Sequence, residues 1–332
     1  KGHTMESLIL CTVLRLSRNL QKLPFPQHLN DMQKMRLTEE LCTVICQGTD
    51  FTPLYLHQLT QAQLYSLAER QIIDTDHAKS PAGKAVLCSP DGQLFVNLNC
   101  DDHIELVCFG AGDSFEAPYA RVRRWDEQFE KRFLYAFDDE FGYLSPSPAG
   151  LGTGLEASVL MHLPLLKENN GIFRTADYLM RLGLLLHGRF GSGSDASGAF
   201  YLLTNRLSMG LSESESMENL IAMAKQLAIQ EIHAEADYCK TPEALLRAQK
   251  AVAQLCQAQT LSAEDGIELL SDLRLAARMG TFPDIPADRL CALLDAIQPT
   301  TLLNANLQCM SLQELDRLRA DWLRVQLHTA QQ

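Results

Sequence analysis

The segment from Tyr143 to Pro164 constrains the fold most, because it joins a glycine-bearing loop to an alternating strand. Gly150, Gly152 and Gly154 give this loop backbone angles that residues with a Cβ avoid, and such loops can turn their amides toward an anion. Between Val159 and Leu163, apolar residues recur at every second position, which is typical of a half-buried strand. A glycine-rich turn is more often only a turn, so its function has to be judged from the rest of the chain.

The composition indicates an ordinary globular protein with room for one large domain and a smaller one. The chain has 332 residues, 46% of them hydrophobic. Its formal net charge of −12 argues against nucleic acid and anionic membranes as partners. No apolar run approaches the roughly 18–20 residues that span a bilayer, and no secretory signal is recognisable, so we expect a cytoplasmic protein. The ten cysteines lack paired CxxC spacing, so we expect reduced thiols and no metal site.

The first two thirds of the chain predict strands interleaved with helices. Strand patterns occupy part of 8–26 and both arms of a hairpin, 85–89 and 94–99, with Asp91-Gly92 at its bend. Helical patterns cover 30–46, 60–73, 119–137 and about 171–183. A second glycine-rich loop at 187–198 separates two further apolar strands. Together these elements predict an α+β fold with a largely antiparallel sheet.

Everything after Leu211 predicts helices. Ser212 with Glu215 and Ser311 with Glu314 have the spacing of capping boxes, and further helices are expected to begin after Thr241 and Ser262. We therefore expect two domains, an α+β domain over 5–235 and a small all-helical domain over 236–332.

Charged residues at two strand ends leave alternatives open. Arg15 and Arg18 follow an apolar run, where arginines are usually solvated but can also contact a phosphate. Asp101 and Asp102 end another strand, where they are either a general-base site or a polar rim. The residue pattern by itself favours the solvated arginines and the polar rim.

Several loops taken together resemble the bacterial protein-arginine kinases, the McsB-like members of the ATP:guanido phosphotransferase (phosphagen kinase) family. The resemblance rests on LRLSRNL at 14–20, NLNCDDHIEL at 97–106, YAFDDEFGYLSPSPAGLGTGLEASVLMHLP at 135–164, HGRFGSGSDASG at 187–198, LSDLRLAARMG at 270–280 and LDRLRADWLR at 315–324. It implies an antiparallel sheet flanked by helices, a helical tail, and an ATP site built almost entirely from arginines.

The chain departs from the family pattern at the positions that the resemblance assigns to chemistry. Val13 stands where the first motif has an arginine, whereas Arg15 and Arg18 are retained. In the second motif, Asp101 is at the position of the catalytic glutamate. Glu105 is at the position of a phosphate-binding arginine, which is a reversal of charge.

The central and last motifs also lack residues that the family pattern assigns to chemistry. Ser147 stands at the position of the reactive cysteine, and Glu156 at that of another arginine. His187 replaces the arginine of the last motif, and Ser192 replaces its second carboxylate. Of the five arginines that the resemblance implies around the triphosphate, only Arg15 remains.

These departures favour a pseudokinase that has lost ATP binding and phosphoryl transfer and acts through protein contacts in protein quality control. No cofactor is expected in that case. The alternative is an active protein-arginine kinase that uses Mg-ATP and has rebuilt its phosphate site from Lys84, Arg189 or the arginines between 121 and 124.

The tail resembles a phosphoarginine-binding pocket and supports a third hypothesis, a reader of phosphoarginine without kinase activity. Asp316 and Arg319 match its motif and lie three residues apart, where both could contact one phosphoguanidinium. Leu315 replaces the first arginine of the motif, and an ordinary surface ion pair is the alternative. The resemblance also implies protein partners: a zinc-finger activator, a Clp-type unfoldase, a heat-shock repressor, an intact paralogue or a second copy of the chain.

Overall fold

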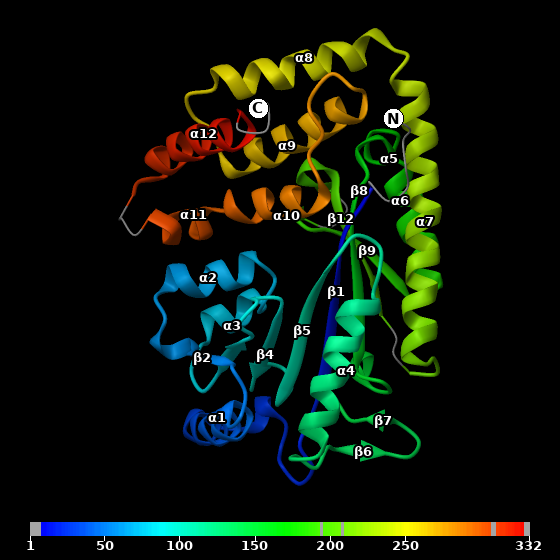
Figure 1. Cartoon of the computed structure of the whole chain (residues 1–332). Helices are drawn as coiled ribbons and strands as arrows, with labels where there is room; N and C mark the ends of the chain where they lie inside the picture. Colours follow the sequence, from blue (N-terminus) through cyan, green and yellow to red (C-terminus); the bar gives the residue numbers. More distant parts are fainter. Residues whose placement is uncertain (1–7, 193–194, 207–208, 307–309, 329–332) are drawn as a thin grey trace.

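An antiparallel eight-stranded sheet forms the centre of the fold in the computed structural model, which describes residues 8–192, 195–206, 209–306 and 310–328 (Figure 1). The strand order is β2-β3-β4-β5-β1-β8-β12-β9, and every neighbouring pair is antiparallel. The strands are β1 (Ile9–Arg18), β2 (Thr52–Tyr55), β3 (Ala85–Cys88), β4 (Leu94–Leu98), β5 (Ile104–Ala111), β8 (Leu155–His162), β9 (Leu184–Gly188) and β12 (Phe200–Asn205). The predicted antiparallel α+β fold is therefore confirmed.

Two small hairpins complete the strands. They pair β6 (Phe137–Asp138) with β7 (Gly142–Tyr143), and β10 (Gly191–Ser192) with β11 (Asp195–Ala196). The predicted hairpin is present as β3 and β4, with Gly92 in the turn at a φ of +66°. A glycine suits this position because positive φ is unfavourable for residues with a Cβ.

Helices flank the sheet and build the C-terminal region as far as the structure describes it. They are α1 (Asp31–Cys46), α2 (Gln61–Glu69), α3 (Thr75–Lys79), α4 (Glu116–Glu130), α5 (Pro164–Glu168), α6 (Gly171–Arg181), α7 (Glu213–Tyr238), α8 (Pro242–Gln257), α9 (Ala263–Arg278), α10 (Ala287–Ala296), α11 (Pro299–Asn306) and α12 (Leu312–His328). The predicted caps at Ser212, Thr241 and Ser262 are confirmed, since each side chain accepts an amide hydrogen bond from its own first turn. The helix predicted over 119–137 ends at Glu130, so its last residues were assigned wrongly.

Apolar clusters cover both faces of the sheet. On one face, Leu14 and Leu16 pack in a cluster with side chains of α4 and α7. On the other face, Val13 and Val107 pack with residues of α2 and α3, whereas Leu160 and Phe200 pack with residues of α9, α10 and α12. The second face therefore carries two separate clusters, and the space between them becomes a cleft.

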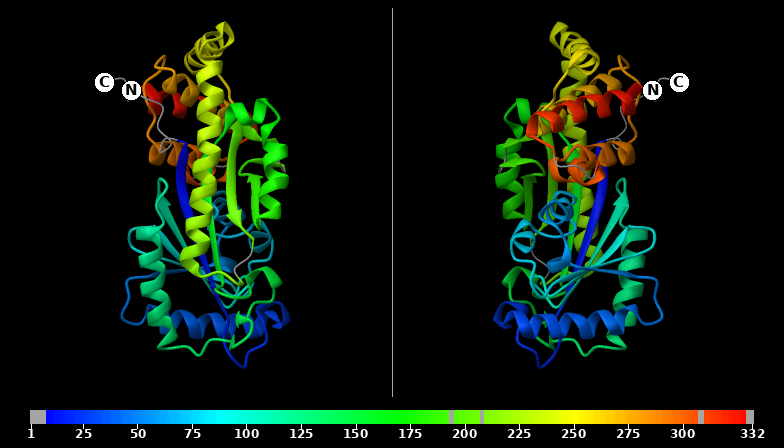
Figure 2. Two further views of the ribbon diagram at one scale, coloured as in Figure 1. Left: turned by 90° about the vertical axis from the view of Figure 1, so that its right-hand side faces the viewer. Right: turned by 90° about the vertical axis from the view of Figure 1, so that its left-hand side faces the viewer.

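The long helix α7 runs along one side of the molecule, from the level of the sheet to the C-terminal helices (Figures 1 and 2). The boundary expected at 235/236 lies inside its last turn, and the helix continues through it. Glu235 forms a buried ion pair with Arg278 of α9. Within the described ranges, no helix is both long enough and apolar enough to cross a membrane, and nine cysteines are free thiols.

Candidate functional site

The cleft is a cavity of about 820 Å³ on the second face of the sheet. Seven of the motif positions that the family resemblance assigns to the active site line it: Val13, Arg15, Asp101, Glu105, Ser147, Glu156 and His187. Segments that are far apart in the chain therefore meet here, as the resemblance implied. Arg18, Asp316 and Arg319 do not belong to the lining that the structure describes.

Antiparallel register explains why these residues share one face. Arg15 in the central strand β1 lies directly opposite Glu156 in β8, and Ser17 lies opposite Glu105 in β5. Directly paired residues of an antiparallel ladder point to the same side, and so do residues two apart in one strand. His187 in β9 joins the set through its pairing with Leu202 of β12.

Arg15 is held by the two glutamates that stand where the family pattern has arginines. Its Nη1 lies 3.2 Å from Glu105 Oε1 and 3.1 Å from Glu105 Oε2, and its Nε lies 3.9 Å from Glu156 Oε1. Its Nη2 donates to the carbonyl oxygen of Gln71. Burial lowers the pKa of Arg15, but the charges of Glu105 and Glu156 raise it overall, so the guanidinium stays charged. The retained arginine is thus already neutralised by its neighbours.

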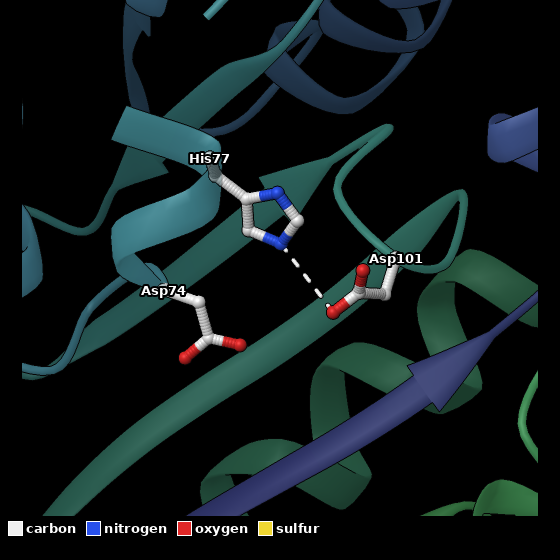
Figure 3. A group of neighbouring side chains, drawn as sticks. All are labelled: Asp74, His77 and Asp101. Atoms are coloured by element: carbon white, nitrogen blue, oxygen red, sulfur yellow. Dashed lines mark ion pairs between the residues drawn. The ribbon is translucent and has the colours of Figure 1, made fainter. Parts of the chain in front are cut away.

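Asp101 and Asp102 are adjacent in the chain but have different contacts. Asp102 is buried and accepts hydrogen bonds from the Asn19 amide and the Ser145 hydroxyl, which fasten the loop between β4 and β5. Asp101 faces the cleft, where its carboxylate lies 3.4 Å from His77 Nε2 (Figure 3). The hydrogen bond from His77 is the main reason that the pKa of Asp101 is lowered.

His77 and Asp74 were missed by the sequence analysis. His77 lies on α3, and Asp74 is the N-cap residue just before it. With Asp101 they form a cluster of side chains that can ligate a metal ion (Figure 3). The only local signal was the spacing D-x-x-H, which puts two side chains on one side of a helical turn. That spacing is too common to indicate a site without the third residue, which lies 24 residues further along the chain.

The glycine-bearing loop is shaped by packing. Gly154 has a φ of +66°, and a Cβ placed there would lie 2.7 Å from the Ser17 carbonyl oxygen. Ser147 lines the cleft, and its amide donates to the Ser145 hydroxyl. The Gly150 amide donates to the Ser147 carbonyl and is therefore already occupied rather than turned toward an anion.

Arg18 lies outside the cleft and is fully buried. Its Nε and Nη2 donate to the two carboxylate oxygens of Asp126 in α4, at 3.1 and 2.8 Å, and Nη1 donates to the carbonyls of Ser17 and Thr153. The guanidinium also lies 3.6 Å from the centre of the Tyr143 ring. These contacts occupy the guanidinium within the fold, so the nucleotide contact expected for Arg18 stays a prediction that this geometry does not favour.

The last motif is only partly described. His187 faces the cleft, and burial lowers the pKa of its imidazole, so the ring is a neutral substitute for a guanidinium. The Nδ1 of His187 is buried without a hydrogen-bond partner among the described residues. The side chain of Ser192 lies outside the described residues.

Of the cations proposed for a rebuilt phosphate site, Lys84, Arg189, Arg121 and Arg123 are engaged elsewhere. Arg189 lines the cleft but pairs with Asp295 of α10, and its side chain is only 5% exposed. Lys84 is buried and donates to the Ser80 carbonyl. Arg121 and Arg123 pair with other residues. Carboxylates accordingly dominate the lining: Glu69, Asp74, Asp101, Asp102, Glu105 and Glu156 stand against Arg15, Arg189 and Arg206.

The two tail residues lie close together, as their spacing predicted, and Arg319 is buried whereas Asp316 is 32% exposed. Arg319 Nη1 lies 2.6 Å from Asp316 Oδ1, and Arg319 is only 1% exposed. Its Nε and Nη1 also donate to the carbonyls of Ile297 and Leu261. The ion pair of the alternative interpretation is therefore present, but its arginine is buried rather than at the surface. The phosphoarginine contact stays a prediction, and it would require Arg319 to leave two backbone carbonyls.

Comparison with known proteins agrees with the fold and the cleft. Residues 32–234 match the family described as ATP:guanido phosphotransferase, C-terminal catalytic domain, and residues 245–332 match the protein-arginine kinase McsB C-terminal domain. A protein-arginine kinase of Syntrophomonas wolfei is 30% identical, over 99% of this chain and 94% of the relative. One from Symbiobacterium thermophilum is 31% identical, over 96% and 93%.

Solved structures of small-guanidine kinases have the same fold. The duplicated taurocyamine kinase from Schistosoma mansoni matches with a TM-score of 0.62 at 20% identity, over 74% of this chain and 37% of the duplicated one. Lombricine kinase matches with a TM-score of 0.60 at 21% identity, over 71% and 69%. The chain therefore belongs to the ATP:guanido phosphotransferase family and is a homologue of the protein-arginine kinases.

Proposed function

We propose that this homologue of the protein-arginine kinases has lost ATP binding and phosphoryl transfer and works as a pseudokinase that binds other proteins. One observation carries the proposal: Arg15 is paired with Glu105 and Glu156, which line the cleft beside it on the two neighbouring strands. The resemblance assigns all three positions to arginines that surround a triphosphate. Here two of them are acids, and they neutralise the third.

The size of the electrostatic change supports the loss of nucleotide binding. A charge-assisted hydrogen bond contributes roughly 1.5–3 kcal/mol net, so four lost arginines remove about 6 kcal/mol at the low end. A nucleotide with a Kd between ~1 mM and ~1 μM has only about 4–8 kcal/mol of binding free energy in total. In addition, a glutamate and a phosphate charge 4 Å apart repel each other by about 4 kcal/mol at an effective dielectric constant of 20.

Catalysis is weakened separately from binding. Phosphoryl transfer depends on positioned positive groups that spread the charge of the transition state. The cleft offers Val13 and the neutral His187 at two further positions where the resemblance places arginines. Deprotonation of a guanidinium, whose pKa lies above about 12, also needs a well-placed base. Asp101 is one methylene shorter than the glutamate that it replaces and is paired with His77.

The conserved fold would then function by binding other proteins. The resemblance supplies the proposed partners: a zinc-finger activator, a Clp-type unfoldase, a heat-shock repressor, an intact paralogue or a second copy of this chain. The acidic net charge of −12 favours partners with basic surfaces over nucleic acid.

Calorimetric titration with Mg-ATP up to about 1 mM tests the proposal. We expect no binding to the unmodified chain. The variant with Glu105→Arg and Glu156→Arg should gain about 100-fold in affinity, because two charge-assisted hydrogen bonds contribute about 3 kcal/mol. The matched variant with Glu105→Gln and Glu156→Gln removes the repulsion between the carboxylates and the phosphates without adding positively charged donors. Its affinity for Mg-ATP should therefore increase less than that of the arginine variant.

A Kd below 1 mM for the unmodified chain would overturn the proposal. Mass spectrometry then decides the alternative: phosphoarginine on an unfolded protein substrate after incubation with Mg-ATP would identify an active kinase with a rebuilt phosphate site. Failure of the arginine variant to bind better than the glutamine variant, with both still folded, would refute electrostatics as the cause of the lost binding.

A further inference from the structure

An imidazole and two carboxylates meet at the edge of the cleft (Figure 3). The Nε2 of His77 lies 3.4 Å from Asp101 Oδ2, and one ligating atom from each of Asp74, His77 and Asp101 lies within 4.8 Å of the other two. We propose that these three residues bind a divalent transition-metal ion. The site does not depend on nucleotide binding, so it stands whether or not the chain is a pseudokinase.

The fold builds this cluster from two separate segments. Asp74 precedes the short helix α3 at its N-cap, and His77 follows three residues later on the same side of the turn. Asp101 comes from the loop that joins β4 to β5, and the buried Asp102 fastens this loop through its bonds to Asn19 and Ser145. Two of the three ligands thus sit on or beside a helical turn, and the third is presented by an anchored loop.

The exposed carboxylate of Asp74 is not used as a helix cap. An aspartate at an N-cap normally accepts a hydrogen bond from an amide of the first turn, which stabilises a helix by about 1 kcal/mol. The carboxylate of Asp74 makes no such bond in this structure. Its side chain extends toward His77 and Asp101 instead (Figure 3). The Asp74 carboxylate is therefore available to bind a metal ion together with His77 and Asp101.

The local charge also calls for a cation. Among the described residues, no lysine or arginine forms an ion pair with Asp74 or Asp101, and His77 is the only ion-pair partner of Asp101. The nearby Arg15 is bonded to Glu105, and Lys84 donates to the carbonyl of Ser80. Two carboxylates held this close repel each other, and a divalent ion between them would remove that repulsion.

The ligand types select the class of metal. Mg²⁺ and Ca²⁺ prefer oxygen ligands alone, whereas an imidazole with carboxylates suits Mn²⁺, Fe²⁺, Co²⁺ or Zn²⁺. Three protein ligands leave positions open for water or a bound group, as in metal sites that are not purely structural. The Asp101 side chain is 73% exposed, so these open positions face the cleft.

Electron paramagnetic resonance with Mn²⁺ on the full chain tests the site, because Mn²⁺ avoids the free thiols that would compete for Zn²⁺. We expect one bound Mn²⁺ per chain, and Mg²⁺ in tenfold excess should not displace it. His77→Ala and Asp101→Asn should each weaken binding at least tenfold, since loss of even an outer-shell partner typically costs 10–100-fold.

Asp76→Asn is the matched control, because Asp76 lies on the same helix but pairs with Lys79 and is not in the cluster. It should leave Mn²⁺ affinity unchanged, and circular dichroism should show that all variants are folded. Absence of stoichiometric Mn²⁺ binding would mean that the cluster is only a His77–Asp101 ion pair. Binding that survives both ligand variants, or that falls equally with Asp76→Asn, would also overturn the proposal.

Discussion

Replacing Asp126 by asparagine should destabilise the protein strongly, because it would leave the buried Arg18 guanidinium without its ion-pair partner. Arg18 is fully buried, and the Asp126 side chain is 5% exposed. The two residues form a bidentate pair, the strongest common geometry between arginine and a carboxylate. Asparagine keeps the shape of aspartate but removes the charge, so the change isolates electrostatics from packing.

The structure sets the expected magnitude. Removing one partner of a buried ion pair costs about 3–5 kcal/mol, since the other charge stays buried. Arg18 keeps its bonds to two carbonyls and lies 4.0 Å from Glu213, so the lower end of that range applies. With an unfolding entropy of about 2.1 cal/mol/K per residue over 332 residues, a loss of about 3 kcal/mol lowers Tm by about 4 °C.

Urea denaturation followed by circular dichroism measures the free energy of unfolding, and Glu40→Gln supplies the control. Glu40 pairs with Arg36 on the surface of α1, where both side chains are more than half exposed, so its loss should cost less than about 0.5 kcal/mol. A loss below about 1 kcal/mol for Asp126→Asn would refute the structural role of Arg18. That result would favour the ligand contact that the family resemblance implies for Arg18.

Two further predictions concern stability. Gly154→Ala should lower the free energy of unfolding by at least 1 kcal/mol more than Gly92→Ala does. Both glycines have a φ of +66°, so both alanine variants share a backbone strain of roughly 1–2 kcal/mol. Only at Gly154 does the new Cβ also clash with the Ser17 carbonyl oxygen. Equal losses in urea denaturation would disprove the close approach. Burial raises the pKa of Glu231 from 4.5 to about 8 in the folded protein. The folded protein therefore binds this proton more tightly than the unfolded chain does, and the stability that Glu231 contributes is lost as the pH rises from about 4.5 to 8. The stability of the chain relative to Glu231→Gln should fall by up to about 1.4 kcal/mol per pH unit there, and parallel pH profiles would contradict this.

The sequence predicted most of the elements because their signals are local. A capping box at Ser212 or an alternating strand after Gly154 depends on residues within a few positions of each other. Errors arose where tertiary packing decided. The helix predicted to reach residue 137 stops at Glu130, because Phe137 pairs with Tyr143 in a small hairpin. The strand after Gly154 was predicted to be half-buried, but Leu160 and His162 on its other face are buried as well, because the C-terminal helices cover them.

The cleft was only partly predictable for the same reason. The resemblance named seven residues that do line it, but the local pattern could not reveal Asp74 and His77. The cluster that they form with Asp101 exists only because the β4–β5 loop brings Asp101 beside them.

By itself, the sequence determined the secondary structure, the antiparallel class of the fold and the family, because periodicity, capping and motifs are properties of neighbouring residues. Only the tertiary structure decided what each arginine does. Arg15, Arg18 and Arg319 all stand in motifs that the family resemblance links to phosphate. Their partners lie far along the chain: Glu105 is 90 residues from Arg15, and Asp126 is 108 residues from Arg18. The energy of a charged group depends on burial and on such distant partners, and both are established only when the sheet and its helices have packed together.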